Sequence, residues 1–310
     1  MSTNNTKLDT QMIVQDYLPI WINAFIVDRK ARGLTNNTLL YYQRKLKQFN
    51  EYAESQAVTR ISQLDATTIR QFLLWMEDTG HNPGGVRTSY RAIRSFLHWY
   101  EEETDETTQI HKVKAPKVPV DPLEGVTLET VMKMVEVCNS GSFTDDRDAT
   151  ILLALFDTGC RARELLSIQL ADVNQMLGDV LIRSGKGRKP RVVYLGKTTR
   201  KALRRYLQHR TDNNPALFIT IGDNTRLSYS GLREAVGRRA KLAGMVKQPS
   251  LHSFRRGFAI TMLRSKTDLY TLARLMGHTD ITVLKYYLKL TDVDTAEAFR
   301  KASPVDGSFN

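Results

Sequence analysis

The sequence contains little cysteine and no long apolar run, and these two absences narrow its class. Among 310 residues there are two cysteines, Cys138 and Cys160, which lie far apart and follow no signal peptide. We therefore expect a reducing, cytoplasmic location and no disulfide. No apolar stretch approaches the roughly 18 residues that a membrane-spanning helix needs. We therefore expect a soluble protein without a membrane partner.

The sequence also lacks the signatures of metal and nucleotide sites. It has no zinc-type or carboxylate cluster with metal-ligand spacing, so we expect no metal and no other cofactor. Lys186 stands between Gly185 and Gly187, but a P-loop has Ser or Thr after its lysine and another glycine further upstream. Both features are missing here, so nucleotide hydrolysis is not predicted.

Positive charge is the most prominent property that the sequence does have. The formal net charge is +12 at pH 7, which favours a polyanionic partner but also fits an anionic membrane surface or solubility alone. Residues 183–210 contain eleven Lys or Arg and no Asp or Glu. A solvated helix face would explain the cations after residue 199, which are Arg200, Lys201, Arg204, Arg205 and Arg210. We favour a DNA backbone as the partner of this run because no acidic residue interrupts it.

Residues 1–106 are predicted to form a helical domain. Apolar residues recur there at spacings of three and four in four segments, with turn residues between them. Trp21, Trp75 and Trp99 are expected in its core rather than stacked on bases. The four predicted helices are Val14–Arg32, Thr38–Glu54 capped by Asn37, a third that follows the cap Asp65, and Val86–Glu101.

Residues 107–122 are predicted to be an extended linker, and residues 123–310 a second domain that is mainly α-helical. Three prolines lie among lysines and valines in residues 112–122, a composition that does not continue a helix. These lysines fit contact with a DNA backbone and equally well a plain spacer. The length of the chain allows a separate core for each domain.

The second domain is predicted to contain a small antiparallel β-sheet. Residues 180–183 and 191–195 are rich in β-branched and aliphatic residues, and a Gly-Lys-Gly turn separates them. This pattern predicts a hairpin with Lys186 at its tip, where the side chain can move.

Six side chains of the second domain form a set suited to attack on a phosphodiester. Guanidinium forks and imidazole N–H groups can bind the oxygens on which negative charge develops. A tyrosine hydroxyl can act as the nucleophile and a lysine ammonium as the acid, so no metal is required. Taken singly, each of these residues also fits an ordinary surface position. The six are Arg161, Lys186, His252, Arg255, His278 and Tyr287.

Helix geometry supports the convergence of part of this set. Arg161 follows the helix break at Thr158-Gly159 and begins a new helix, where free N–H groups attract anions. His252 and Arg255 are three residues apart on a predicted helix and share one face.

The order and spacing of the set resemble the catalytic domain of the tyrosine recombinases, the integrase family of phages and transposons. The resemblance covers about two-thirds of the chain. The segment from Thr158 to Leu165 resembles the first box of that family, which implies phosphate binding by Arg161 and a supporting role for Glu164. Cys160 departs from the usual aliphatic residue of this box.

The other boxes of the family can be matched in the same way. The hairpin resembles the one that carries a mobile general acid, which implies that role for Lys186. His252-Ser253-Phe254-Arg255 matches the His-x-x-Arg box. Gly277-His278, followed nine residues later by Tyr287, matches the last box, although Tyr287-Leu288-Lys289 lacks the commoner Tyr-x-His ending. The hairpin residues Arg188, Lys189 and Arg191 are expected to bind DNA.

The resemblance implies a site-specific recombinase acting on double-stranded DNA. The helical domain resembles the SAM-like core-binding domain of the same family. Tyr287 would form a 3′-phosphotyrosyl link, and four protomers on two sites would exchange strands through a Holliday junction. We favour integration or excision of a mobile element because of the tail Ser303-Pro304-Val305-Asp306. Chromosome-dimer resolution, a type IB topoisomerase-like enzyme and a non-enzymatic DNA-binding regulator are the alternatives.

Overall fold

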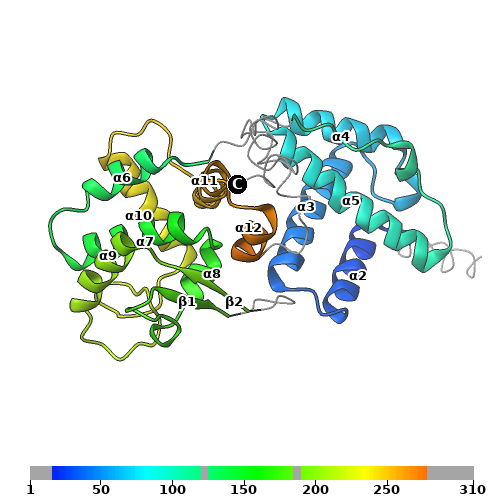
Figure 1. Ribbon diagram of the computed structural model, residues 1–310. Coiled ribbons are helices and arrows are strands. Elements are labelled where there is room, and N and C mark those ends of the chain that lie inside the picture. The colour runs from blue at the N-terminus through cyan, green and yellow to red at the C-terminus, as the bar shows by residue number, and fades with distance from the viewer. Residues whose placement is uncertain (1–15, 120–124, 184–189, 278–310) are drawn as a thin grey trace, which may run out of the picture. The chain divides into compact units, whose positions relative to one another are not determined.

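Residues 16–119, 125–183 and 190–277 are described by the computed structural model (Figure 1). The chain divides into two compact units, with the boundary between Asp121 and Pro122. Each unit has a hydrophobic core of its own. Within the described ranges, no helix is both long enough and apolar enough to cross a lipid bilayer.

Four α-helices lie in residues 16–119, and polar side chains set where they begin. Thr35 accepts a hydrogen bond from the backbone N–H of Thr38, so α3 begins two residues before its predicted start. Asn82 caps α5, and Pro83 occupies the first turn, where its fixed φ favours a helix. Helix α5 therefore begins before the predicted Val86. The helices are α2 (Leu18–Ala31), α3 (Asn36–Ser55), α4 (Ala66–Asp78) and α5 (Pro83–Thr104).

Aromatic rings fill the core of the first unit. The ring centroids of Phe25 and Trp99 are 5.4 Å apart, and those of Phe96 and Trp99 are 6.4 Å apart. Trp99 is buried and Trp21 packs against the same cluster, as predicted. The prediction is wrong for Trp75, which is 37% exposed because it lies towards the outer face of α4.

The segment predicted to be an extended linker begins inside the first unit. It contains a 3-10 turn, η2 (Ile110–Lys112), and both Ile110 and Val113 are buried. The Tyr90 hydroxyl donates to the carbonyl of Val113, and Arg70 donates to the carbonyl of Lys112, each at 2.8 Å. These bonds attach the segment to the four-helix unit up to Val113.

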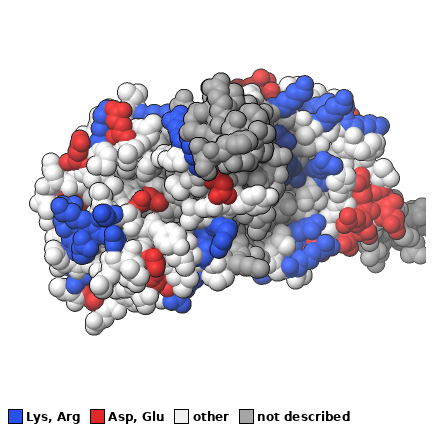
Figure 2. Space-filling view, in the orientation of Figure 1, with Lys and Arg blue, Asp and Glu red and all other residues white. Residues whose placement is uncertain are grey.

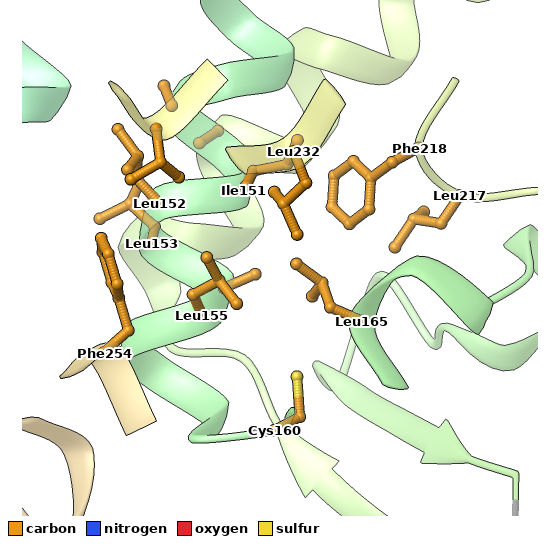
Figure 3. Packing of buried hydrophobic residues seen from close by; sticks show 14 of the residues in the cluster. Ile151, Leu152, Leu153, Leu155, Cys160, Leu165, Leu217, Phe218, Leu232 and Phe254 are labelled. Carbon is orange, nitrogen blue, oxygen red and sulfur yellow. The ribbon is translucent and has the colours of Figure 1, made fainter. Parts of the chain in front are cut away.

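Helix α7 (Phe143–Thr158) is the centre of the second unit. Most of its side chains are buried, and it packs against α6, α9 and α11. In Figure 3, Leu155 of α7 lies close to Leu165 of α8 and Leu232 of α10, all within one apolar cluster. This packing fixes the start of α8. The other helices and strands are α6 (Leu128–Glu136), α8 (Ala162–Ser167), β1 (Asp179–Ile182), β2 (Arg191–Tyr194), α9 (Lys197–Gln208), α10 (Tyr229–Leu242), α11 (Leu251–Arg264) and α12 (Leu269–Met276).

Strands β1 and β2 form the predicted antiparallel hairpin. Asp179 pairs with Tyr194, and Ile182 pairs with Arg191. Val180 and Ile182 of β1 are buried together, because alternate side chains of a strand point to the same face. Val193 of β2, which pairs with Val180, is buried on that face as well. Together with the helices of both units, this small sheet confirms the predicted mainly α fold class.

Buried charges join α7 to α10. Asp148 is 1% exposed and accepts hydrogen bonds from Arg147, Arg238 and Arg239 at 2.8–3.1 Å. Arg239 also forms an ion pair with Asp145 at 2.7 Å. Because charge is costly to bury unpaired, this network holds the two helices in one register.

Candidate active site

The first site residue, Arg161, is positioned by a glycine at the end of α7. Gly159 caps the helix with φ +57°, a left-handed conformation that glycine adopts without a steric penalty. A Cβ at this position would lie 2.2 Å from the ring of Phe258, so the site has no room for a larger residue. Cys160 then turns into the core, where burial raises the pKa of its thiol to about 11. The next residue, Arg161, is the N-cap of α8.

Arg161 is held by Glu164, three residues further along α8. The backbone N–H of Arg161 donates to the Glu164 carboxylate at 2.8 Å, and its Nη1 donates to Oε1 at 3.0 Å. The Arg161 side chain remains 27% exposed. One edge of the guanidinium is thus fixed by the protein while part of its surface is open to a ligand.

Arg255 of α11 is the most deeply buried charged residue of the site. Its side chain is 1% exposed, and its two terminal nitrogens donate to the carbonyls of Gly159 and Met276, each at 2.7 Å. Burial, followed by the positive charge of Arg161, lowers the pKa of Arg255 to about 10. The group therefore stays charged at neutral pH, because its pKa is still well above 7.

His252 lies one turn before Arg255 and is exposed at the surface. Although the residue reaches the surface, its ring is partly shielded from water, which lowers its pKa, and the charges of Arg256, Arg255 and Arg161 lower it further. At neutral pH the ring is therefore neutral, with one N–H to donate. The two arginines that are predicted to bind phosphate thus both lie within electrostatic range of His252.

The site concentrates like charges that repel one another. Arg161 disfavours the charged form of Arg255, and both disfavour the charged form of His252. An anion bound among them would relieve this repulsion. The arrangement is suited to a phosphate group.

Arg191, at the start of β2, also belongs to this site. Its Nη2 and Nη1 donate to the two carboxylate oxygens of Glu164 at 2.8 and 3.3 Å, and its Nε donates to the carbonyl of Leu275 at 2.8 Å. Burial alone would raise the pKa of Glu164, but hydrogen bonds from Arg191 and from the Arg161 N–H outweigh it and lower the pKa to about 2. The side chain predicted to bind DNA is 12% exposed and bonded within the protein.

A second left-handed glycine ends α12. Gly277 has φ +64°, and a Cβ there would lie 2.8 Å from Nη1 of Arg191. Helix ends leave carbonyls without partners, and here Arg191 and Arg255 bind those of Leu275 and Met276. This role of Arg191 was not predicted from the sequence, where the glycine of Gly277-His278 is the signal of a tight approach.

Glycines also bring the start of the second unit against α11. The N–H of Val126 donates to the carbonyl of Ser253 at 3.0 Å. A Cβ on Gly125 would lie 2.5 Å from the backbone nitrogen of Gly257, and a Cβ on Gly257 would lie 2.0 Å from the carbonyl oxygen of Val126. Two backbones are thus in direct contact beside the residues of the His-x-x-Arg box.

Three of the six predicted catalytic residues are therefore brought together: Arg161, His252 and Arg255. Lys186, His278 and Tyr287 lie outside the described residues, as do Arg188 and Lys189. Their predicted roles stay predictions. Strand β1 ends at Ile182 and β2 begins at Arg191, so residues 184–189 connect two paired strands.

The basic run from residue 183 to 210 is divided between surface and interior. Figure 2 shows Lys and Arg side chains gathered over α9. Some of these cations already have partners, since Arg205 pairs with Asp146 at 3.5 Å. Arg210 is 5% exposed and bonded to Asp212 and to backbone carbonyls. The run is therefore partly structural.

The first unit has a basic face of its own. Arg87, Arg91 and Arg94 are exposed on α5 at spacings of four and three, which places them on one side of the helix. They line a groove with Tyr90, His98 and Ala115.

Comparison with known proteins gives matches over most of the chain. The sequence model of the Phage integrase family matches residues 125–293, and that of the Phage integrase, N-terminal SAM-like domain matches residues 23–104. Tyrosine recombinase XerD of Staphylococcus saprophyticus is 29% identical over 303 residues, covering 94% of this chain and 98% of the relative.

Solved structures show the same fold. The Tn1549 transposon integrase in complex with a circular intermediate DNA has a TM-score of 0.76 at 14% identity, covering 92% of this chain and 99% of that one. A lambda integrase tetramer bound to a Holliday junction has a TM-score of 0.72 at 17% identity, covering 86% and 78%. The fold predicted from the sequence, including the SAM-like first domain, is confirmed.

Proposed function

Because the chain belongs to the phage integrase family, we propose that it cuts and rejoins double-stranded DNA through a 3′-phosphotyrosyl intermediate. It is a tyrosine recombinase, a DNA strand-transferring enzyme that acts at specific sites. The observation that carries the proposed mechanism is the cluster of Arg161, Arg255 and neutral His252 in one electropositive site. Such a cluster binds the scissile phosphate and stabilises the charge that develops on it.

The proposed cleavage step uses the residues on either side of this cluster. The Tyr287 hydroxyl oxygen attacks phosphorus and loses its proton to water, the bond from phosphorus to the 5′-oxygen breaks, and Lys186 gives a proton to the leaving oxygen. Arg161 and Arg255 bind the non-bridging oxygens, and His252 and His278 donate N–H groups to them. A 5′-hydroxyl of the partner strand then attacks the phosphotyrosine and releases Tyr287.

Double-stranded DNA is the proposed partner of both units. The exposed arginines of α5 support contact between the first unit and the phosphate backbone. Arg188 and Lys189 remain our candidates for contacts from the hairpin. We propose a homotetramer on two paired sites and a cytoplasmic location. The fold shared with a lambda integrase tetramer bound to a Holliday junction supports this assembly.

Two biological roles fit these residues. We propose integration or excision of a mobile element, and the fold shared with a transposon integrase agrees with it. Chromosome-dimer resolution is the second candidate, because a XerD recombinase aligns over 94% of the chain. The sequence of the cleaved DNA distinguishes the two roles. A mobile-element enzyme cleaves the ends of its element, whereas a dimer resolvase cleaves one chromosomal site.

Covalent trapping tests the proposal. Wild-type protein is incubated with nicked duplexes made from fragmented DNA of its source, and adducts that survive SDS are sequenced and mapped. We expect one adduct, at Tyr287, that Tyr287→Phe abolishes and Tyr286→Phe retains. An adduct at Tyr286 would overturn the nucleophile assignment. Relaxation of plasmids without any sequence requirement would favour the topoisomerase-like alternative, and tight binding without any adduct would favour a regulator.

A further inference from the structure

Arg191 occupies a position between three separate parts of the second unit. It stands at the first residue of β2, its guanidinium binds Glu164 of α8, and its Nε binds the Leu275 carbonyl at the end of α12. Each of these parts is adjacent to a predicted catalytic residue in the sequence: the hairpin to Lys186, α8 to Arg161, and α12 to His278. From this juxtaposition we infer that Arg191 is a positioning residue that holds the first box and the end of α12 in one fixed arrangement.

Hydrogen bonds of Arg161, Arg191 and Arg255 join α8 and the end of α12 into one closed network. Arg191 links Glu164 to the Leu275 carbonyl, and Arg255 links the adjacent Met276 carbonyl to that of Gly159. Gly159 precedes Arg161 by two residues, and Arg161 returns to Glu164 at 3.0 Å. Two guanidinium groups thus connect the same two segments at neighbouring points. A rigid double link of this kind fixes both distance and orientation.

Electrostatics gives Arg191 a second effect on the site. Glu164 carries one negative charge beside Arg161. If Arg161 were the only cation bound to Glu164, the negative charge of Glu164 would cancel the positive charge of Arg161. Arg191 binds both oxygens of that carboxylate and supplies a compensating positive charge. Arg161 is thereby oriented by Glu164 while the site keeps a net positive charge for the phosphate.

A lysine cannot reproduce this geometry. The planar guanidinium binds one carboxylate with two nitrogens and a carbonyl with the third, whereas a lysine ammonium is a point charge on a flexible stem. The plane also lies against Gly277, where a Cβ would be 2.8–3.1 Å from three of its atoms. The glycine and the arginine therefore form a matched pair.

The inference rests on the proposed function, so its test begins with a duplex that wild-type protein traps covalently. Single-turnover cleavage at saturating DNA is measured for Arg191→Met, Arg191→Lys and Glu164→Gln, with DNA affinity and thermal stability measured alongside. The matched control is Arg226→Met, which removes an arginine bonded to a carbonyl of α8, that of Leu166, but not to Glu164 or α12. We expect both Arg191 variants to cleave about tenfold to a hundredfold more slowly with DNA affinity within about threefold.

The pH profile separates positioning from a general loss of structure. Among the described residues, the groups that act on Glu164 include the guanidinium groups of Arg161, Arg191 and Arg255 and the thiol of Cys160. Without Arg191, the Glu164 pKa rises from about 2 towards its ordinary value, so protonation on acidification removes the acceptor of Arg161. The ratio of Arg191→Met to wild-type cleavage should therefore fall from pH 6 to pH 4, and the double variant with Glu164→Gln should not show this fall.

Three results decide the inference. A pH-dependent ratio in Arg191→Met with a flat ratio in Arg226→Met supports it. If the Met variant does not fold, Arg191→Lys, which keeps the charge but not the geometry, supplies the comparison of cleavage rates. Wild-type cleavage rates in both Arg191 variants would overturn it, as would a loss that is equal at every pH and proportional to lost stability. If wild-type protein traps no DNA at all, the proposed function fails and the inference fails with it.

Discussion

Substitution of Gly159 by alanine tests the geometry at the start of the site. The change has two effects, since alanine must adopt φ +57° and its Cβ must fit 2.2 Å from the Phe258 ring. The left-handed conformation costs about 1–2 kcal/mol for a residue with a Cβ. Forcing an extra methyl group into a packed core costs a further ~1–3 kcal/mol. We therefore expect Gly159→Ala to lower the free energy of unfolding by about 2–5 kcal/mol.

A matched glycine isolates the second effect. Gly141 has φ +69°, but no atom lies within 4 Å of a Cβ built there. Gly141→Ala should therefore show the conformational effect alone. Urea unfolding of both variants gives the difference, which we expect to be about 1–3 kcal/mol. The Gly159 carbonyl is an acceptor of Arg255, so DNA cleavage by Gly159→Ala should fall as well. Equal unfolding free energies for the two variants would refute the steric argument.

Substitutions at Arg255, Asp148, Arg91 and His252 test other parts of the structure. Arg255→Lys should slow single-turnover cleavage by about a hundredfold, because one ammonium cannot keep the bonds to both the Gly159 and Met276 carbonyls. Asp148→Ala should destabilise the protein by about 3–5 kcal/mol in urea unfolding, because it leaves buried arginines unpaired. Arg91→Ala, on the exposed face of α5, should reduce the slope of log DNA affinity against log salt by about 1, measured by fluorescence anisotropy. His252 has a lowered pKa in the folded state, so on acidification the unfolded state takes up its proton first. Stability should thus fall below about pH 6.5 in the wild type and fall less in His252→Gln, and an identical pH dependence would contradict this.

Local sequence signals were sufficient for much of the fold. Apolar periodicity and caps such as Asp65 predict the helices, and the Gly-Lys-Gly turn predicts the hairpin. The error at the start of α5 has a local cause as well. Gly84 and Gly85 indicated a break, but the capping signal of Asn82-Pro83 outweighed them.

The site was predictable where chemistry and spacing coincide. Arg161, His252 and Arg255 were predicted to bind phosphate, and the structure brings these three together, while their binding of phosphate stays a prediction. The internal bonds of Arg191 were not predicted, because it stands in a run of cations that look alike in sequence. Its partner Glu164 is 27 residues away, and no local pattern reports a pairing over that distance.

The contact between Gly125 and Gly257 decides where a catalytic fragment can begin. A fragment that starts after Val126 loses both the backbone packing and the hydrogen bond to the Ser253 carbonyl, although all of α11 is still present in it. A chain that starts at Pro122 keeps them. Gly125 and Val126 therefore stabilise the position of the helix that carries the His-x-x-Arg box. A fragment designed from helix boundaries alone would start at Leu128 and would lack this stabilising contact.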